Sequence, residues 1–326
     1  MDAEAPSGAH EAEKAGWLRA VSFAAVIDHV TVEVVDALTR SDVASLLLRG
    51  PVIATWLYDH PTERPYGDID LMVDPDRLDA ARGVLTRLGF THQLERATPL
   101  DHTFHDEPWL RGAHFVDVHR TLSGAGTPPA TVWQALTREM TEIVIDGTPV
   151  PAPGVAGRLV VVVLHAAHHG VDFAKPLEDL QRAVERVPVE AWRAAARVAA
   201  QIDASAAFAS GLRLLPSGAA LTETLELPRA TSVEAVLRAS SAPPMAIALE
   251  WLAHGPLTRR QKVAFVARKV VPPPAFLRAS SRLANRGWAG LAAAYVLRIG
   301  SLAAKLPAGL RALGRARRQA PRAPDR

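Results

Sequence analysis

Residues 46–73, LLLRGPVIATWLYDHPTERPYGDIDLMV, decide the fold of this chain. The apolar pattern predicts a short strand, a glycine turn, a helix and, after a polar loop, a second strand, at residues 46–48, 49–50, 52–58 and from 68 onward. Side chains alternate faces along a strand, so Asp68 and Asp70 lie on the same side of the second strand. Two carboxylates this close repel each other, and each raises the pKa of the other unless a cation lies between them.

A divalent metal ion is the usual partner of such a carboxylate pair. Mg²⁺ takes hard oxygen ligands, commonly one or two carboxylates, with substrate phosphates in other positions. Asp68 and Asp70 therefore indicate a site for phosphate chemistry. The alternative is a polar turn at a strand edge, because Asp-x-Asp is frequent by chance. The flanking apolar strand, the upstream Gly50 and the nearby Arg64 favour the site.

A third carboxylate lies in residues 114–119, HFVDVH. Polar and apolar residues alternate here, which predicts a strand with Asp117 and His119 on one face. The apolar neighbours of Asp117 favour a functional role, and the alternative is an aspartate on the exposed face of an edge strand. His119 could support a site, contact a phosphate or be a packed, hydrogen-bonded core histidine.

Together these motifs resemble a known superfamily. Gly50 after an apolar strand, then a helix, Arg64 and the GDIDL sequence at residues 67–71 look like the nucleotidyltransferase superfamily typified by DNA polymerase beta. Within it the chain is most similar to an uncharacterised bacterial nucleotidyltransferase-like family with a Leu-Leu-(Lys/Arg)-Gly start. Residues 116–119, 164–165 and 179–180 match the second half of that family's pattern.

The resemblance implies an α+β fold, in which a small mixed sheet with flanking helices is followed by an all-helical C-terminal domain. It also implies an enzyme that uses Mg²⁺ to move NMP from an NTP, with ATP as the expected donor, to a hydroxyl or phosphate acceptor. In this chain Asp68 and Asp70 would be metal ligands and catalytic residues. Asp117 would hold the metal that activates the acceptor and could take its proton.

The substrate-binding residues implied by the resemblance are Arg49, Gly50, Arg64 and His119. Gly50 would let the backbone approach a triphosphate, and the arginines suit forked phosphate contacts. A glycine turn without a ligand and surface salt bridges are the alternatives. Superfamily members usually have Gly-Ser or Gly-Gly where this chain has Gly50-Pro51, and the proline removes one amide donor.

That departure supports a second hypothesis from another class, a catalytically inactive binding or accessory protein of a biosynthetic or toxin–antitoxin system. The intact carboxylates Asp68, Asp70 and Asp117 argue against it. The sequence does not choose among a protein, an RNA or a small molecule as acceptor. Three histidines lie on adjoining faces of one predicted helix: His165, His168 and His169. They would line the cleft or pack at a domain junction. The alternative is that they bind the metal of a phosphohydrolase.

Composition describes an ordinary globular protein. The 326 residues are 48% hydrophobic and 22% charged, with a net charge of +3 and no cysteine, which permits a reducing cytoplasm. The acidic N-terminus does not resemble a signal peptide, and the apolar runs at 159–164 and 291–296 are shorter than a membrane span needs. We therefore expect a cytoplasmic protein without a membrane span. The basic C-terminus permits nucleic-acid binding but does not indicate it.

The domain organisation follows from the turns and the composition. Pro149, Pro151, Pro153 and Gly154 indicate a domain boundary. The predicted parts are a disordered N-terminus, an α/β nucleotidyltransferase-like domain, a helical domain and a basic disordered tail, at residues 1–15, 16–150, 155–313 and 314–326. Short antiparallel strands are expected at residues 90–94, 102–105 and 114–119, and a long alanine-rich helix at residues 189–215. The helical patterns also predict that three tryptophans lie in the core or at a domain junction: Trp192, Trp251 and Trp288.

Overall fold

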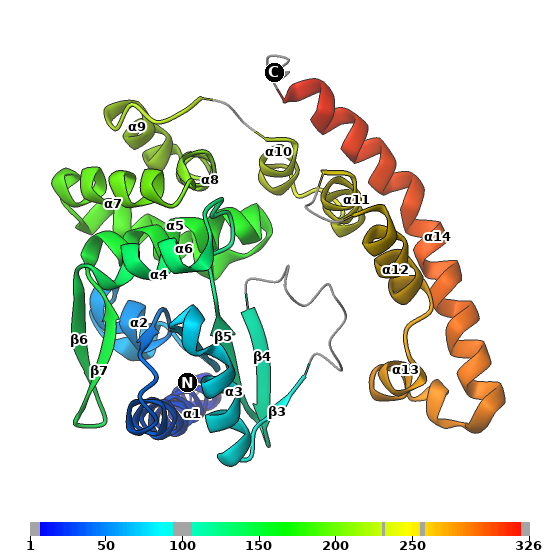
Figure 1. The fold of residues 1–326 in the computed structure, drawn as a ribbon, viewed down its shortest axis with the longest axis horizontal. Helices are drawn as coiled ribbons and strands as arrows, with labels where there is room; N and C mark the ends of the chain where they lie inside the picture. The colour runs from blue at the N-terminus through cyan, green and yellow to red at the C-terminus, as the bar shows by residue number, and fades with distance from the viewer. Residues whose placement is uncertain (1–6, 94–105, 230–231, 255–257, 321–326) are drawn as a thin grey trace, which may run out of the picture. The chain divides into compact units, whose positions relative to one another are not determined.

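A computed structural model describes residues 7–93, 106–229, 232–254 and 258–320 (Figure 1). The chain divides into two compact units. The N-terminal unit comprises residues 1–95, 105–169 and 173–228, and the C-terminal unit comprises residues 96–104, 170–172 and 229–326. Each unit is described by itself below.

A five-stranded mixed sheet forms the centre of the N-terminal unit. Its strand order is β1-β2-β5-β4-β3, and only β2 and β5 are parallel neighbours. The strands are β1 (Ser45–Leu47), β2 (Asp68–Val73), β3 (Thr91–His92), β4 (Asp106–Arg111) and β5 (His114–His119). The predicted strand at 114–119 is therefore confirmed. The predicted strand at 90–94 is shorter in the structure, where it spans Thr91–His92, and residue 94 lies outside the described residues. The predicted strand at 102–105 also lies outside the described residues.

Local sequence signals explain where the helix after β2 begins and ends. The Asp74 carboxylate accepts a hydrogen bond from the backbone N–H of Asp76 at 3.0 Å, which caps the 3₁₀ turn Pro75–Arg77. Helix α3 (Leu78–Arg87) follows, and Gly89 takes a φ of 84° just after it, a conformation that favours glycine. These contacts fix the chain on leaving β2.

Two further helices precede β2. Helix α1 spans Ser7–Arg40, so residues 7–15 are helical where the sequence analysis expects disorder. The amphipathic pattern of Val30, Val34 and Leu38 continues N-terminally through helix-forming Glu, Ala and Lys residues, which keeps the backbone helical. Helix α2 (Pro51–Leu57) agrees with the predicted helix to within one residue at each end, and five of its residues are buried.

The proline-rich segment after the sheet is a strand and not a domain boundary. Strands β6 (Met140–Ile145) and β7 (Thr148–Pro153) form an antiparallel hairpin around the Asp146-Gly147 turn, where both residues have positive φ. Proline lacks an N–H to donate, and Pro149, Pro151 and Pro153 alternate along β7. Their nitrogens therefore lie on one edge, away from β6, and β7 pairs with β6 alone.

The helices that follow belong to the same unit as the sheet, which corrects the boundary predicted near residue 150. Helix α5 (Val155–His169) buries ten of its residues, and one continuous core runs from Ile27 to Leu212 through sheet and helices. These helices, with α4 (Pro129–Thr137), gather at one end of the sheet (Figure 1). The others are α6 (Ala174–Arg186), α7 (Val189–Gln201), α8 (Ser205–Leu212) and α9 (Pro216–Thr224).

The predicted long helix at 189–215 is divided, because Asp203, between α7 and α8, has a φ of 52° that a helix does not accommodate. Trp192 is buried in the core, as predicted. An apolar helix such as α5 cannot leave the sheet, since all of its faces need cover. For that reason the boundary between units lies near Pro228.

The C-terminal unit consists of helices. They are α10 (Val233–Ala239), α11 (Pro244–His254), α12 (Arg259–Val270), α13 (Pro274–Ser280) and α14 (Gly287–Gln319), with a 3₁₀ turn at Leu283–Asn285. Helix α14 includes residues 314–319, so the predicted disordered tail is helical up to Gln319. Trp288, expected in a core or junction, is 84% exposed. Apolar residues occur at helical spacing on more than one face of α14, and Trp288 lies on a face that does not pack against the rest of its unit.

Helix α14 also bears on the prediction that no segment spans a membrane. In the described part of the chain, Gly287–Gln319 is the one helix whose length and composition would allow it to cross a bilayer. Alanines between the larger apolar residues keep its mean hydropathy high over a longer window than the uninterrupted apolar runs suggest. Core helices of soluble proteins pass the same test, so the absence of a span stays a prediction.

Candidate functional site

Three carboxylates from the two parallel neighbouring strands converge in the N-terminal unit. Register places Asp70 of β2 opposite Asp117 of β5, and Asp68 lies two residues earlier on the same face of β2. One oxygen from each of the three carboxylates lies within 4.8 Å of the others. Asp70 is buried, Asp117 is half-buried and Asp68 is exposed. The predicted convergence is thus confirmed, whereas the catalytic roles of these residues stay predictions.

The electrostatics of this cluster favour a bound cation. Although Asp68 is exposed as a residue, the protein around its carboxyl group removes part of its hydration, and this desolvation together with Asp70 raises the pKa of Asp68 above its ordinary value. Burial, Asp70 and Asp106 raise the pKa of Asp117 to about 6. Both carboxylates therefore resist ionisation in the absence of a positive partner. Three oxygen donors with this spacing and mutual repulsion fit a hard divalent cation such as Mg²⁺.

Asp70 differs from the other two because it already has positive partners. Burial alone would raise its pKa, but Arg49 and the hydrogen bond with His119 outweigh burial and hold the pKa well below its usual range. The Arg49 guanidinium donates to Asp70 Oδ1, and His119 Nε2 lies 3.0 Å from the same oxygen. Asp70 is therefore the ionised anchor of the cluster.

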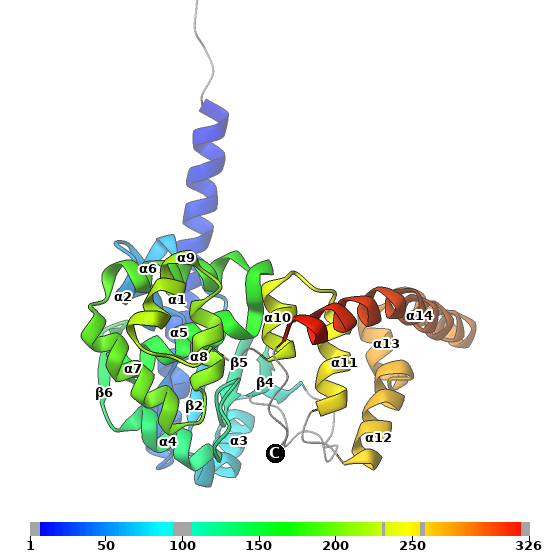
Figure 2. The ribbon, with the colours of Figure 1, turned by 90° about the horizontal axis from the view of Figure 1, so that it is seen from above.

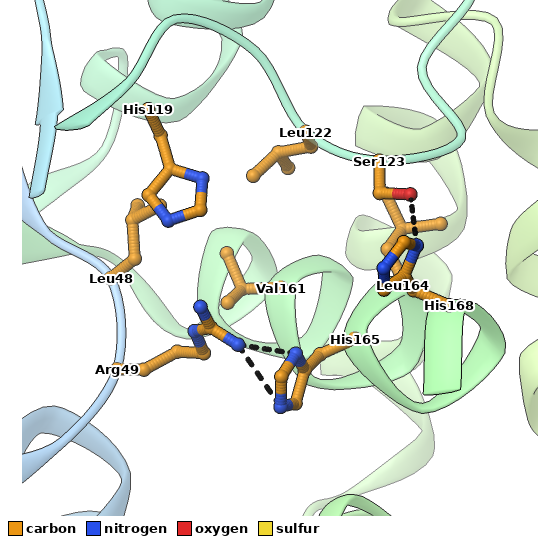
Figure 3. A pocket seen from close by; sticks show the side chains of 9 residues that line it. All are labelled: Leu48, Arg49, His119, Leu122, Ser123, Val161, Leu164, His165 and His168. Carbon is orange, nitrogen blue, oxygen red and sulfur yellow. Dashed lines mark hydrogen bonds between the residues drawn. The ribbon is translucent and has the colours of Figure 1, made fainter. Parts of the chain in front are cut away.

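Arg49 connects the carboxylates to a small pocket (Figure 3). Its Nη1 lies 3.0 Å from His165 Nε2, and Figure 3 shows the guanidinium between His119 and the His165 ring. Burial and the charge of Arg49 strongly lower the pKa of His165, so this imidazole is neutral. The pocket is lined by Leu48, Arg49, His119, Leu122, Ser123, Val161, Leu164, His165 and His168.

The histidine cluster on α5 packs and does not chelate. His168 Nδ1 lies 2.8 Å from Ser123 Oγ, and the His169 ring lies edge-on to the rings of His165 and His168. Across residues 7–93, 106–229, 232–254 and 258–320, the one group of three ligand side chains close enough to share a metal is the aspartate triad. The helix therefore lines the pocket beside the carboxylates, as one of the two sequence interpretations expects.

Gly50 occupies a backbone conformation that only glycine adopts readily. Its φ of 62° and ψ of −121° lie outside the regions open to other residues, and it directly precedes Pro51 at the start of α2. Its carbonyl accepts hydrogen bonds from the N–H groups of Ile53 and Ala54. The glycine is thus required by the turn itself, and its contact with a triphosphate stays a prediction.

Arg64 forms a buried ion pair with Asp179, and its predicted contact with a phosphate stays a prediction. Its Nε and Nη2 donate to the two carboxylate oxygens of Asp179 at 2.6 Å each, and Tyr58 Oη donates to Oδ1 at 2.8 Å. Arg64 is 4% exposed and Asp179 2%. The sequence offset toward the carboxylates made Arg64 a candidate phosphate ligand, and this pair fastens the loop before β2 to α6.

Lys175 is a neighbour of the site that sequence reasoning did not find. It lies in the first turn of α6 and donates from Nζ to the carbonyl of Pro65. Partial burial and the charge of Arg64 lower its pKa, whereas Asp179 and Asp68 act in the opposite direction. An ammonium this close to Asp68 could meet an anionic substrate group. Its only sequence signal is a position four residues before Asp179.

The solved structures to which this chain is similar include two of ANT(2'')-Ia and one of a nucleotidyltransferase-like protein. The solution structure of the antibiotic-resistance factor ANT(2'')-Ia is 15% identical and covers 55% of this chain and 93% of its own, with a TM-score of 0.40. The crystal structure of ANT(2'')-Ia with adenylyl-2''-tobramycin is 16% identical and covers 53% of this chain and 97% of its own, with a TM-score of 0.40. The crystal structure of an antigenic nucleotidyltransferase-like protein from Paracoccidioides brasiliensis is 15% identical and covers 56% of this chain and 91% of its own, with a TM-score of 0.33. No substrate or residue role follows from matches at this level.

The comparison with curated proteins finds no match. A family model described as an uncharacterised nucleotidyltransferase matches residues 10–217, which is more than half of the 326 residues. The matched residues include the five-stranded sheet, the aspartate triad and helices α5 to α8. The chain therefore belongs to this uncharacterised nucleotidyltransferase family.

Proposed function

We propose that this chain is an Mg²⁺-dependent nucleotidyltransferase that moves NMP from ATP or another NTP to a hydroxyl or phosphate acceptor. One observation carries the proposal, the convergence of Asp68, Asp70 and Asp117 from two parallel strands with their oxygens within 4.8 Å of one another. Such a cluster is costly to retain without a cation, because two of its members have raised pKa values.

The chemistry divides among the residues as follows. An acceptor oxygen bonds to the α-phosphorus of the NTP, the bond to the bridging oxygen breaks, and pyrophosphate leaves. Bound Mg²⁺ would neutralise phosphate charge and orient the reacting oxygens. Asp117, with a pKa of about 6, is suited to take the acceptor proton near neutral pH. Lys175 and Arg49 are the proposed contacts of the triphosphate oxygens, since both interact electrostatically with Asp68.

Calorimetry and a pyrophosphate assay test the proposal. ATP should bind the full chain in Mg²⁺ and lose at least about tenfold in affinity in EDTA, because the carboxylates then repel the phosphates. Asp68→Ala with Asp70→Ala should abolish both the Mg²⁺ dependence and any pyrophosphate release. Glu142→Ala with Glu190→Ala removes two exposed carboxylates outside the site and is the matched control. Equal ATP binding by both double variants would refute the metal site.

A second candidate function rests on the contact between Arg49 and Asp70. This pair, with His119, satisfies the central carboxylate without a metal, and Pro51 removes an amide near the turn. A binding protein that keeps the fold without turnover would have these features. ATP binding in Mg²⁺ with no pyrophosphate release across protein, RNA and small-molecule acceptors would favour it. Arg49→Ala then separates the cases, because a triphosphate contact loses ATP affinity on substitution.

A further inference from the structure

The C-terminal unit exposes far more apolar surface than the N-terminal unit does. Among the described residues, ten of the sixteen exposed large hydrophobic side chains lie between Val263 and Leu310. Helix α12 has no buried residue, and an apolar groove lies along it. The groove is lined by Leu252, Lys262, Val263, Val266, Ala267, Arg268, Val270 and Val271. An exposed apolar area of this extent marks an interaction surface.

Five of the six exposed large apolar residues described on α14 lie on one face, and the sixth, Leu297, lies on the other side of the helix. Its exposed apolar residues include Trp288, Val296, Ile299, Leu306 and Leu310, at successive spacings of eight, three, seven and four. With 3.6 residues per turn, these spacings place all five on one stripe along the helix. We call these five residues the α14 stripe.

An adjacent face of α14 packs inside its own unit. Near its start, Ala294 joins a small cluster with Leu277 and Ala284, and near its end Leu313 and Ala316 join another. Helices α10 to α13 accordingly lie along one side of α14 (Figures 1 and 2). The stripe is therefore available for a partner outside the unit.

Charge identifies the partner. Residues 229–326 contain 18 Lys and Arg against 3 Asp and Glu, a net charge of +15. Residues 1–228 contain 19 against 31, a net charge of −12. Within the described part of α14, Lys305, Arg315 and Arg318 are exposed, while Arg298 donates to the Lys269 carbonyl and stays at the helix flank. An apolar stripe flanked by basic residues is typical of helices that lie in a membrane interface.

We propose that the C-terminal unit binds the surface of an anionic lipid bilayer, with the α14 stripe in the acyl boundary and the basic residues on the lipid headgroups. A second copy of the unit fits less well, because two surfaces of the same high positive charge repel each other. Nucleic acid would use the charge but leave the aliphatic stripe in water. A spanning helix would have to expose Arg298 and the packed face of α14 to lipid.

Vesicle flotation of the full chain tests the proposal. The protein should float with phosphatidylcholine vesicles that contain phosphatidylglycerol, and poorly with phosphatidylcholine alone or in high salt. Replacing Trp288, Ile299 and Leu306 with Ser should weaken binding at least about tenfold, because each loses buried apolar area. Lys305→Glu, Arg315→Glu and Arg318→Glu together should weaken it by a similar factor or more.

The matched control replaces Met140, Val144 and Val155 with Ser, because these exposed apolar residues lie in the N-terminal unit. This variant should bind vesicles within about twofold of the unmodified chain. Circular dichroism confirms that each variant is folded. Equal binding to neutral and anionic vesicles, or none to either, would overturn the proposal. Three other results would also overturn it. A dimer that dissociates in the stripe variant would indicate a second copy as the partner, and release from membranes by detergent alone would indicate a spanning helix. Charge-dependent RNA binding without vesicle binding would indicate nucleic acid.

Discussion

The two units of this chain use their amino acids in opposite ways. Residues 1–228 carry a net charge of −12, and the N-terminal unit buries its apolar residues in one continuous core from Ile27 to Leu212. Residues 229–326 carry +15, and the C-terminal unit has two small clusters that consist largely of alanine. A deep core can position buried charges for chemistry. A shallow one leaves surface free for contact with a partner.

Ion pairs give the largest expected difference between the units. Arg64→Ala leaves Asp179 buried without its partner and should lower the free energy of unfolding by about 3 to 5 kcal/mol. Arg317→Ala breaks the corresponding pair with Glu250 in the C-terminal unit, where Arg317 is 45% exposed, and should cost about 1 kcal/mol or less. Urea unfolding followed by circular dichroism measures both.

The same pair has an internal control. Arg64→Met with Asp179→Leu should be less destabilising than either single change, because no charge is then left buried alone. If Arg64→Ala instead left stability unchanged and reduced ATP affinity, the role assigned from the sequence would be restored.

Core truncation should show the next largest difference. Leu180 is fully buried in the N-terminal core, and Leu180→Ala should cost about 3 kcal/mol. Leu313 lies in the small cluster of the C-terminal unit, and Leu313→Ala should cost about 1 to 2 kcal/mol, because water and neighbouring helices can fill the space more easily. Equal losses would mean that the C-terminal unit is as tightly packed as the N-terminal one.

Two aspartates of the triad should change stability in opposite directions in EDTA. Asp70 has a lowered pKa, so its ionised form stabilises the folded state, and Asp70→Asn should cost about 2 kcal/mol at neutral pH. Asp117 has a raised pKa of about 6, so ionising it in the folded state costs free energy as pH rises through 6. Asp117→Asn should therefore stabilise the chain by about 1 kcal/mol above pH 6.

The gain from Asp117→Asn should shrink as pH falls from 6 toward 4 and disappear below the unfolded-state pKa near 4, where the native aspartate is protonated in both states. Thermal unfolding from pH 4 to pH 8 measures it. The opposite trend, with the gain largest at acid pH, would show that Asp117 is stabilised as the anion.

The α14 stripe should give the smallest change in stability. Replacing Trp288, Ile299 and Leu306 with Ser removes side chains that are exposed in the folded chain, so the free energy of unfolding should change by no more than about 0.5 kcal/mol. Such a result would mean that apolar residues stabilise the fold of the N-terminal unit, whereas the exposed apolar residues of the C-terminal unit serve to bind a partner. A loss of several kcal/mol would place the stripe in an intramolecular contact.

Much of the N-terminal unit could be predicted from local patterns. The apolar pattern predicted α2 and β2, and alternation of polar and apolar residues predicted β5. The convergence of Asp117 on Asp68 and Asp70 was inferred from family resemblance, because spacing along the chain does not say which strands become neighbours. The register of the parallel pair then determined which carboxylates meet.

Errors arose where one residue type serves two purposes. Alternate prolines were taken for a boundary, although they are compatible with an edge strand that pairs on one side only. The ion pair of Arg64 was not foreseen, because its partner Asp179 lies more than a hundred residues away along the chain. Trp288 was taken for a core residue, although only tertiary packing decides which face of α14 is covered.

The sequence by itself determined strands β2 and β5, helix α2, the acidic site motif and the contrast in charge between the two parts of the chain, because these depend on neighbouring residues and on composition. The tertiary structure alone decided that α5 to α9 complete the sheet's core, that Arg64 belongs to Asp179 and that Lys175 lies near Asp68. Those outcomes depend on which distant segments exclude water from one another, and that competition is resolved only when the whole chain packs.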